Sequence, residues 1–266
     1  MAWKVRVGLL ALLLVSFTKA EDADLSVSEI IEKANRNLVR GADEPLVIDD
    51  IAYGLDGRNA DPCTSAACMW PKSGDGNIYV PYTIHDHYSE REEAVILRAF
   101  QSIKDESCIR FVERTTQKDY IHILSLSGCY SHVGRRGGEQ TLSLNRMGCV
   151  YHHTVQHELL HALGFNHEQT RSDRDNHIKI LYENINPIMS YNFDKIETLN
   201  QDTPYDYNSV MQYHRTAFSA NGQPTMIPIP DPNVEIGKAR EMSKNDILRL
   251  NRLYRCIKKG ETPVYE

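Results

Sequence analysis

One stretch, HELLHALGFNHE at residues 157–168, restricts what this chain can fold into more than any other part of the sequence. His157 and His161 are four residues apart, so on a helix both imidazoles lie on one face and can reach the same metal ion. Glu158 is the next residue round, close enough to contact a water on that ion. The pattern therefore predicts a helical metal site with an acidic group beside it.

Gly164 can adopt a positive φ and end that helix sharply. The chain can then turn back, so that His167 supplies a third ligand. Three protein ligands leave one coordination position open, which separates a catalytic zinc from a structural one. Further on, SVMQY contains Met211 and Tyr213. A buried methionine turn beneath the zinc accompanies this extended histidine motif, although Met211 alone would be an ordinary core residue.

Residues 1–20 are typical of a secretory signal peptide. Lys4 and Arg6 precede the apolar run VGLLALLLVSF, which is short for a membrane span. The small residues of TKA predict cleavage after Ala20, and the alternative is a membrane anchor. Since no second apolar run of spanning length follows, we expect a soluble protein outside the cell without a membrane partner.

Residues 21–58 are predicted to form a removable pro-segment. Its first half is acidic and has apolar residues at helical spacing. It contains no cysteine and ends at Arg58, where a trypsin-like protease could cut. The alternative is a permanent N-terminal arm. The working domain would comprise residues 59–266.

That domain is predicted to be α+β. Runs rich in β-branched and aromatic residues predict strands over 77–84, 108–114, 120–126 and 141–144, with a turn over 134–140. Ser89 and Glu92 predict a capping box at the start of an amphipathic helix, and Ser243 and Asp246 can cap another. Between Pro187 and Glu241 the chain is expected to be mostly irregular.

Six cysteines fit an oxidising compartment and allow 15 pairings, among which the sequence does not choose. Cys63 and Cys68 enclose only a tight loop, and Cys129 and Cys149 flank a glycine-rich hairpin. Those two local pairs would leave Cys108 to meet Cys256. A cysteine–zinc site is the weaker interpretation, because no Cys-x-x-Cys pair occurs.

The composition is that of a soluble globular protein, with 41% hydrophobic and 25% charged residues. A net charge of -6 argues against a nucleic-acid partner on electrostatic grounds. We expect a monomer.

Taken together, HELLHALGFNHEQTRSDRDNHI and SVMQY resemble the astacin family, zinc endopeptidases of the metzincin group. The resemblance runs from about Cys63 to Cys256 and includes CIRFVER, GRRGGEQTLSLNRMGCV, TPYDYNSVMQYH and DILRLNRLY. The pair Cys63 and Cys68 and the stretch PIPDPNV are most similar to a six-cysteine fish group of hatching enzymes and nephrosin-like proteases. The resemblance implies two subdomains with a cleft between them: a mixed sheet with helices above, and an irregular lower half with a C-terminal helix.

The same resemblance implies roles for single residues. His157, His161 and His167 would bind one Zn²⁺, and Glu158 would be the general base. Tyr213 would ligate zinc in the resting enzyme and swing to the substrate during the reaction. The implied disulfides are Cys108–Cys256 and Cys129–Cys149, in agreement with the local pairing.

Glu168, directly after the third histidine, is implied to meet the new amino terminus that cleavage at Arg58 would create at Asn59. A buried carboxylate needs a cationic or donor partner, so Glu168 would sense maturation. The alternative is a solvated surface glutamate.

An aspartate of the pro-segment is implied to occupy the open zinc position before maturation. In the family this aspartate usually follows a glycine, whereas PLVIDDIA has Asp49 and Asp50 without one. We assign Asp50, because Ile51 follows it as in related sequences, and Asp49 is the alternative.

The predicted activity is hydrolysis of peptide bonds in extracellular proteins by a latent, secreted zinc endopeptidase, with egg envelope as the substrate that the closest resemblance implies. Strand 141–144 is either the edge that pairs with an extended substrate or an interior strand. Arg215 would favour acidic side chains beyond the scissile bond. The alternatives are an inactive secreted zinc-binding module and a structural egg-coat component; intact Glu158 and Tyr213 argue against the first, and a cleavable pro-segment against the second.

Overall fold

A computed structural model describes residues 25–38, 44–53 and 68–256. The predicted signal peptide, Arg58, Asn59 and Cys63 lie outside these residues. The described helices are α2 (Val27–Asn35), α3 (Glu90–Glu106), α4 (His152–Ala162) and α5 (Lys244–Leu253), together with short 3-10 helices. The strands are β1 (Leu46–Ile48), β2 (Ile51–Tyr53), β3 (Ile78–Ile84), β4 (Ile109–Glu113), β5 (Tyr120–Leu124), β6 (Cys129–Ser131), β7 (Glu139–Leu144), β8 (Ile178–Ile180) and β9 (Met226–Pro228).

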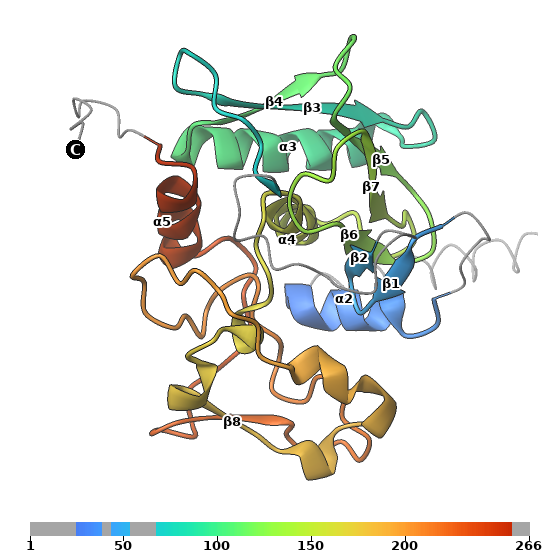
Figure 1. Cartoon of the computed structure of the whole chain (residues 1–266). Helices are drawn as coiled ribbons and strands as arrows, with labels where there is room; N and C mark the ends of the chain where they lie inside the picture. Colours follow the sequence, from blue (N-terminus) through green and yellow to red (C-terminus); the bar gives the residue numbers. More distant parts are fainter. Residues whose placement is uncertain (1–24, 39–43, 54–67, 257–266) are drawn as a thin grey trace, which may run out of the picture.

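A mixed sheet forms the upper part of the molecule, in the order β1-β2-β6-β7-β5-β3-β4 (Figure 1). Strands β4, β3, β5 and β7 pair in parallel, whereas β6 runs antiparallel to β7. Strand β7 therefore lies in the interior of the sheet. The edge interpretation of residues 141–144 is wrong, since both sides of that strand are paired.

Helix α3 begins where the sequence predicts it. The Ser89 and Glu92 side chains form the expected capping box. Ile96, Phe100 and Ile103 recur at helical spacing and are buried against the sheet and α4. The apolar stripe thus decides which face of α3 meets the core.

Helix α4 carries the first two histidines and is buried along its whole length. It ends because Gly164 adopts φ 102°, and the Gly164 and Phe165 amides donate to the His161 and Leu160 carbonyls. The predicted glycine-ended helix is confirmed. Since α4 is enclosed on all sides, its histidines are held by the central core rather than by a surface loop.

The lower half, from about residue 168 to residue 243, consists of loops, short 3-10 helices and the small sheet β8-β9 (Figure 1). It has its own apolar cluster, which includes Phe193, Tyr205 and Tyr213. Helix α5 follows, capped by Ser243 and Asp246 as predicted, and packs against the upper core through Leu250.

Residues 25–38 and 44–53, within the predicted pro-segment, pack against both halves. Helix α2 contacts α4 and β6, and β2 pairs in parallel with β6. The Val27 amide donates to the Ala239 carbonyl below, and Lys238 Nζ lies 2.7 Å from Glu29 Oε1. The segment therefore bridges the upper sheet and the lower loops.

Two predicted disulfides are present. Cys108–Cys256 ties the start of β4 to the end of α5, and Cys129–Cys149 links β6 to the loop before α4. Cys68 is also disulfide-bonded, and Cys63, its predicted partner, lies outside the described residues.

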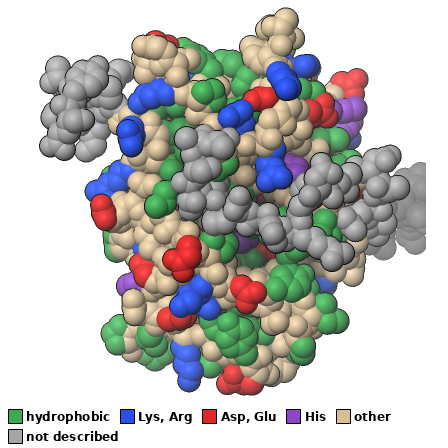
Figure 2. All heavy atoms as spheres, viewed as in Figure 1, with side chains coloured by type: hydrophobic (Ala, Val, Ile, Leu, Met, Phe, Trp, Pro, Cys, Tyr) green, Lys and Arg blue, Asp and Glu red, His purple; other side chains and the backbone are tan. Residues whose placement is uncertain are grey.

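No helix among the described residues is both long and apolar enough to cross a membrane. On the face in Figure 2, Lys and Arg side chains occur together with Asp and Glu side chains rather than alone. The predicted absence of nucleic-acid partners remains a prediction.

Candidate metal centre

Three histidines and one aspartate meet inside the molecule. Asp50 Oδ2 lies 2.8 Å from His157 Nε2, and Asp50 Oδ1 lies 3.0 Å from His167 Nε2 and 3.5 Å from His161 Nε2. One ligand atom from each of the four residues lies within 4.8 Å of every other, and all four residues are buried. Three imidazoles and one carboxylate are a suitable donor set for zinc.

The backbone fixes which ring nitrogens face the centre. His157 Nδ1 lies 2.8 Å from the Val210 carbonyl oxygen, and His161 Nδ1 lies 2.7 Å from that of Phe165. A carbonyl only accepts, so Nδ1 must carry the proton and Nε2 keeps its lone pair for a metal. His161 Nε2 is buried and has no hydrogen-bond partner among the described residues. The site therefore fits the ion that the sequence implied.

Met211 lies in the loop that supports this centre and is buried, as predicted. The loop supplies the Val210 carbonyl to His157, and the Met211 carbonyl accepts the Glu168 amide. Asp246 of α5 stabilises this loop: it accepts from Ser209 Oγ at 2.6 Å and from the Val210 amide at 2.9 Å. The sequence identified Asp246 only as a helix cap, because this second task depends on a loop far away in the chain.

Glu158 is fully buried, and neither carboxylate oxygen has a hydrogen-bond partner in the described part of the chain. Burial raises the pKa of Glu158 well above its ordinary value, and the nearby charges of Asp50 and Asp49 raise it further. A carboxyl group in such a place is suited to taking up and returning a proton.

The two candidate aspartates form the turn between β1 and β2, in which Ile48 pairs with Ile51. Asp49 takes φ 58°, the left-handed region that glycine adopts most easily and aspartate tolerates. Asp50 then points at the three histidines. Burial opposes its ionisation, but the surrounding imidazoles hold the pKa of Asp50 well below its usual range.

Tyr213 lies beside this turn. Its ring centroid is 4.6 Å from that of His167, and the side chain is buried. The Tyr213 hydroxyl donates a hydrogen bond to Asp49 Oδ2. The sequence predicted that Tyr213 lies at the metal centre, but it did not predict the hydrogen bond to Asp49.

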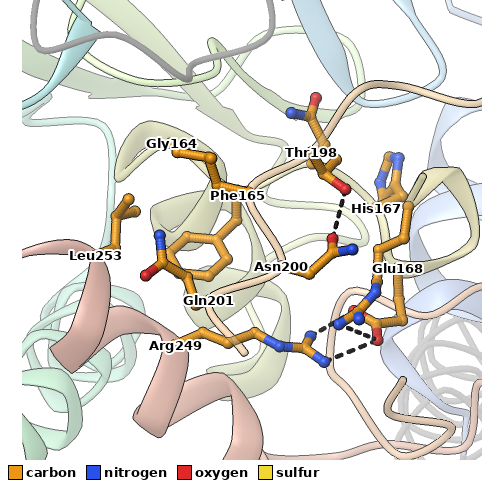
Figure 3. Close-up of a pocket in the computed structure, with 12 residues that line it drawn as sticks. Gly164, Phe165, His167, Glu168, Thr198, Asn200, Gln201, Arg249 and Leu253 are labelled. Carbon is orange, nitrogen blue, oxygen red and sulfur yellow. Dashed lines mark hydrogen bonds and ion pairs between the residues drawn. The ribbon is translucent and has the colours of Figure 1, made fainter. Parts of the chain in front are cut away.

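Glu168 is buried, so the interpretation as a solvated surface residue is wrong. Figure 3 shows its carboxylate facing the Arg249 guanidinium, with Arg249 Nη2 2.9 Å from Oε1. Arg171 Nη1 lies 3.5 Å from the same oxygen, and the Asp206 amide donates to it at 2.7 Å. Burial raises the pKa of Glu168, and the two guanidinium groups oppose that rise. Asn59, its implied partner, lies outside the described residues.

Removing this carboxylate should destabilise the protein. Glu168→Ala would leave Arg249 buried without its counter-charge, at a cost of about 3–5 kcal/mol, whereas Arg171 would keep its ion pair with Asp173. Chemical denaturation of the intact chain should measure that loss in the free energy of unfolding. The double variant Glu168→Leu with Arg249→Met removes both charges and should lose less. Unchanged stability of Glu168→Ala would contradict the importance of the pair.

Arg215 contacts the backbone of the PIPDPNV loop. Its Nη2 donates to the Pro232 and Val234 carbonyls, each at 2.8 Å. The guanidinium therefore supports the PIPDPNV loop. The predicted preference for acidic side chains stays a prediction.

Comparison with known proteins agrees with this geometry. The family profile of Astacin, a peptidase family, matches residues 65–255. High choriolytic enzyme 1 of Oryzias latipes is 52% identical over 80% of this chain and 79% of its own length. Low choriolytic enzyme of the same fish is 45% identical over 86% of this chain and 84% of its own.

A solved structure is also similar. It is that of high choriolytic enzyme 1, described as a hatching enzyme zinc-protease from Oryzias latipes. It superimposes with a TM-score of 0.72 at 52% identity, covering 75% of this chain and all of the other. By its profile, its relatives and its zinc-binding histidines, this chain belongs to the astacin family and is a zinc metalloendopeptidase.

Proposed function

We propose that this chain is the latent precursor of a secreted endopeptidase that digests egg-envelope proteins. The observation that carries the proposal is the position of Asp50, whose carboxylate lies against all three histidines. A group at that point takes the place that a water or a substrate carbonyl needs. The apolar run in residues 1–20 supports secretion.

Latency is supported by a second feature, the pairing of β2 with β6. Strand β6 has β7 on one side, and the predicted pro-segment covers its other side. The Ser131 amide donates to the Asp50 carbonyl at 2.9 Å. An extended substrate can add to such an edge through main-chain hydrogen bonds. Strand β6 therefore replaces residues 141–144 as the candidate substrate strand, available once the segment leaves.

The proposed reaction uses residues already in position. His157, His161 and His167 would hold zinc, which when bound supplies a Lewis acid and makes water reactive near neutral pH. Glu158 would accept the proton of the attacking water and return it to the leaving amine. The Tyr213 hydroxyl would donate to the oxyanion that develops on the scissile carbonyl.

Maturation is proposed to follow cleavage after Arg58 by a trypsin-like protease. The new amino group at Asn59 would be a cation near neutral pH. We propose that it joins the buried network of Glu168 and Arg249, rather than meeting a carboxylate without partners. The mature enzyme would act as a monomer.

Egg envelope is proposed as the substrate because three choriolytic enzymes of Oryzias latipes are 45–52% identical to this chain over most of both chains. If the chain hydrolyses peptide bonds but does not digest egg envelopes, the alternative is a nephrosin-like protease. If it does not hydrolyse peptide bonds, the alternative is an inactive zinc-binding module.

Trypsin treatment should convert the purified chain from silent to active. We expect casein hydrolysis only after treatment, a new amino terminus at Asn59, and solubilisation of isolated fish egg envelopes. Arg58→Ala should stay silent under the same treatment. A zinc-loaded, correctly cut protein that hydrolyses neither substrate would be an inactive module. Casein hydrolysis without attack on envelopes would leave the nephrosin-like alternative.

A further inference from the structure

The turn that carries Asp50 presents a second acidic side chain to the active site. Asp49 and Asp50 are adjacent, and Asp49 lies farther from the histidines: its Oδ2 is 4.0 Å from His167 Nε2, against 3.0 Å for Asp50 Oδ1. Asp50 faces the three histidines, whereas Asp49 Oδ2 accepts a hydrogen bond from the Tyr213 hydroxyl. Asp49 and Tyr213 are 8% and 5% exposed, so water does not compete for this contact.

We propose that Asp49 is a second inhibitory residue, which sequesters the Tyr213 hydroxyl while Asp50 occupies the metal centre. A hydroxyl has one proton to donate. While that proton is given to Asp49, it cannot be given to the oxyanion of a substrate. This inference rests on the proposed function, because it assigns Tyr213 a role in the reaction.

The turn is built to hold Asp49 in this place. The Asn35 side-chain amide donates to the Asp49 carbonyl at 2.9 Å and to the Cys129 carbonyl at 2.7 Å. Its oxygen accepts the Cys129 amide at 2.8 Å. Asn35 thus ties the turn to strand β6, with its side-chain nitrogen as a donor to both and its side-chain oxygen as an acceptor from β6.

The segment also holds the residue that follows Tyr213. The His214 amide donates to Ser28 Oγ at 3.0 Å, and His214 Nε2 lies 2.6 Å from Glu32 Oε2. Both partners lie on α2. Tyr213 is therefore held at its hydroxyl by Asp49 and through its neighbour by the helix. The cavity left between α2, the turn and Tyr213 is only about 10 Å³, so no substrate fits beside them.

The positive φ of Asp49 offers a clean substitution. Asp49→Gly suits φ 58° and keeps the turn that aims Asp50, while it removes the carboxyl group. Asp49→Asn keeps an acceptor oxygen at the same distance from the backbone. The two variants therefore separate the shape of the turn from its contact with Tyr213.

The experiment measures leakage, the activity that a variant shows before cleavage. Each variant is made twice: once with Arg58→Ala, so that it stays uncut, and once with Arg58 kept, so that trypsin can mature it. Leakage is the rate of peptide hydrolysis of the first preparation divided by that of the second. Asp49→Gly should raise leakage by about three- to tenfold, as expected for one lost hydrogen bond. Asp49→Asn should leak like the parent. In the Tyr213→Phe background Asp49→Gly should change leakage by less than about twofold, since its partner is already gone.

Two controls identify the cause. Glu29→Ala breaks the ion pair with Lys238 and loosens the segment elsewhere, so it should raise leakage equally with Tyr213 or Phe at that position. Hydrogen exchange of the uncut Asp49→Gly chain should quicken in peptides covering 209–216 but not in those covering 46–53, at unchanged zinc content.

Parent-like leakage of Asp49→Gly would overturn the inference. So would an equal rise in the Tyr213→Phe background, because Asp49 would then act on the turn alone. A parent chain that stays inactive after correct cleavage refutes the proposed function instead, and hydrogen exchange still reports whether Asp49 holds Tyr213.

Discussion

Glu158→Gln should lower kcat of the matured enzyme by about 10²–10⁴-fold, the usual contribution of a general base. The substitution keeps the shape of the side chain but removes its ability to accept a proton. Glu158 is fully buried beside the histidines and has no competing hydrogen-bond partner among the described residues. The loss should therefore concern the chemical step rather than the fold.

The measurement is hydrolysis of a fluorogenic peptide, with zinc content and melting temperature determined on the same sample. Glu93→Gln, on the exposed side of α3, makes the same chemical change away from the site and should retain full activity. Activity of Glu158→Gln within tenfold of the parent, at equal zinc content, would remove Glu158 from the reaction.

Removing zinc from the matured enzyme should lower activity by at least about 10³-fold, since a Lewis acid contributes several kcal/mol to such reactions. The melting temperature should fall as well, because three buried imidazoles lose their shared partner. One equivalent of zinc should restore both. The uncut chain should release zinc to a chelator more slowly, because Asp50 is available as a fourth ligand.

Substitution of a ligand should reproduce the effect without a chelator. His161→Ala should bind little zinc, whereas His85→Ala, which removes an exposed histidine after β3, should retain it. Undiminished hydrolysis by protein stripped to less than about a tenth of an equivalent would contradict a catalytic metal.

Several features could be predicted because they depend on neighbours in the chain. His157 and His161 share a helix face by periodicity alone, and Gly164 ends that helix because only a positive φ turns the chain toward His167. The capping box of Ser89 and Glu92 is likewise a local signal, as is the amphipathic face of α3. The resemblance to astacins agreed with the local disulfide pairing and added the approach of Asp50 to the histidines.

The order of the strands in the sheet could not be predicted from the sequence. Residues 141–144 have the same composition whether they lie at an edge or inside, and only the position of β6 and β5 on either side decides. Strand β6 is paired with β7 on one side and with β2 on the other, so its second side would become an edge only if the segment that carries β2 left.

The sequence also did not predict which groups the charged and polar side chains would contact. The sequence determined the three histidines, the glutamate between them and the local elements that carry them. Only the tertiary structure decided that Glu168 pairs with Arg249, 81 residues away, and that Asp49 binds Tyr213, 164 residues away. A buried carboxylate must find a donor, but many donors are available in the sequence, and packing of distant segments selects the one within reach.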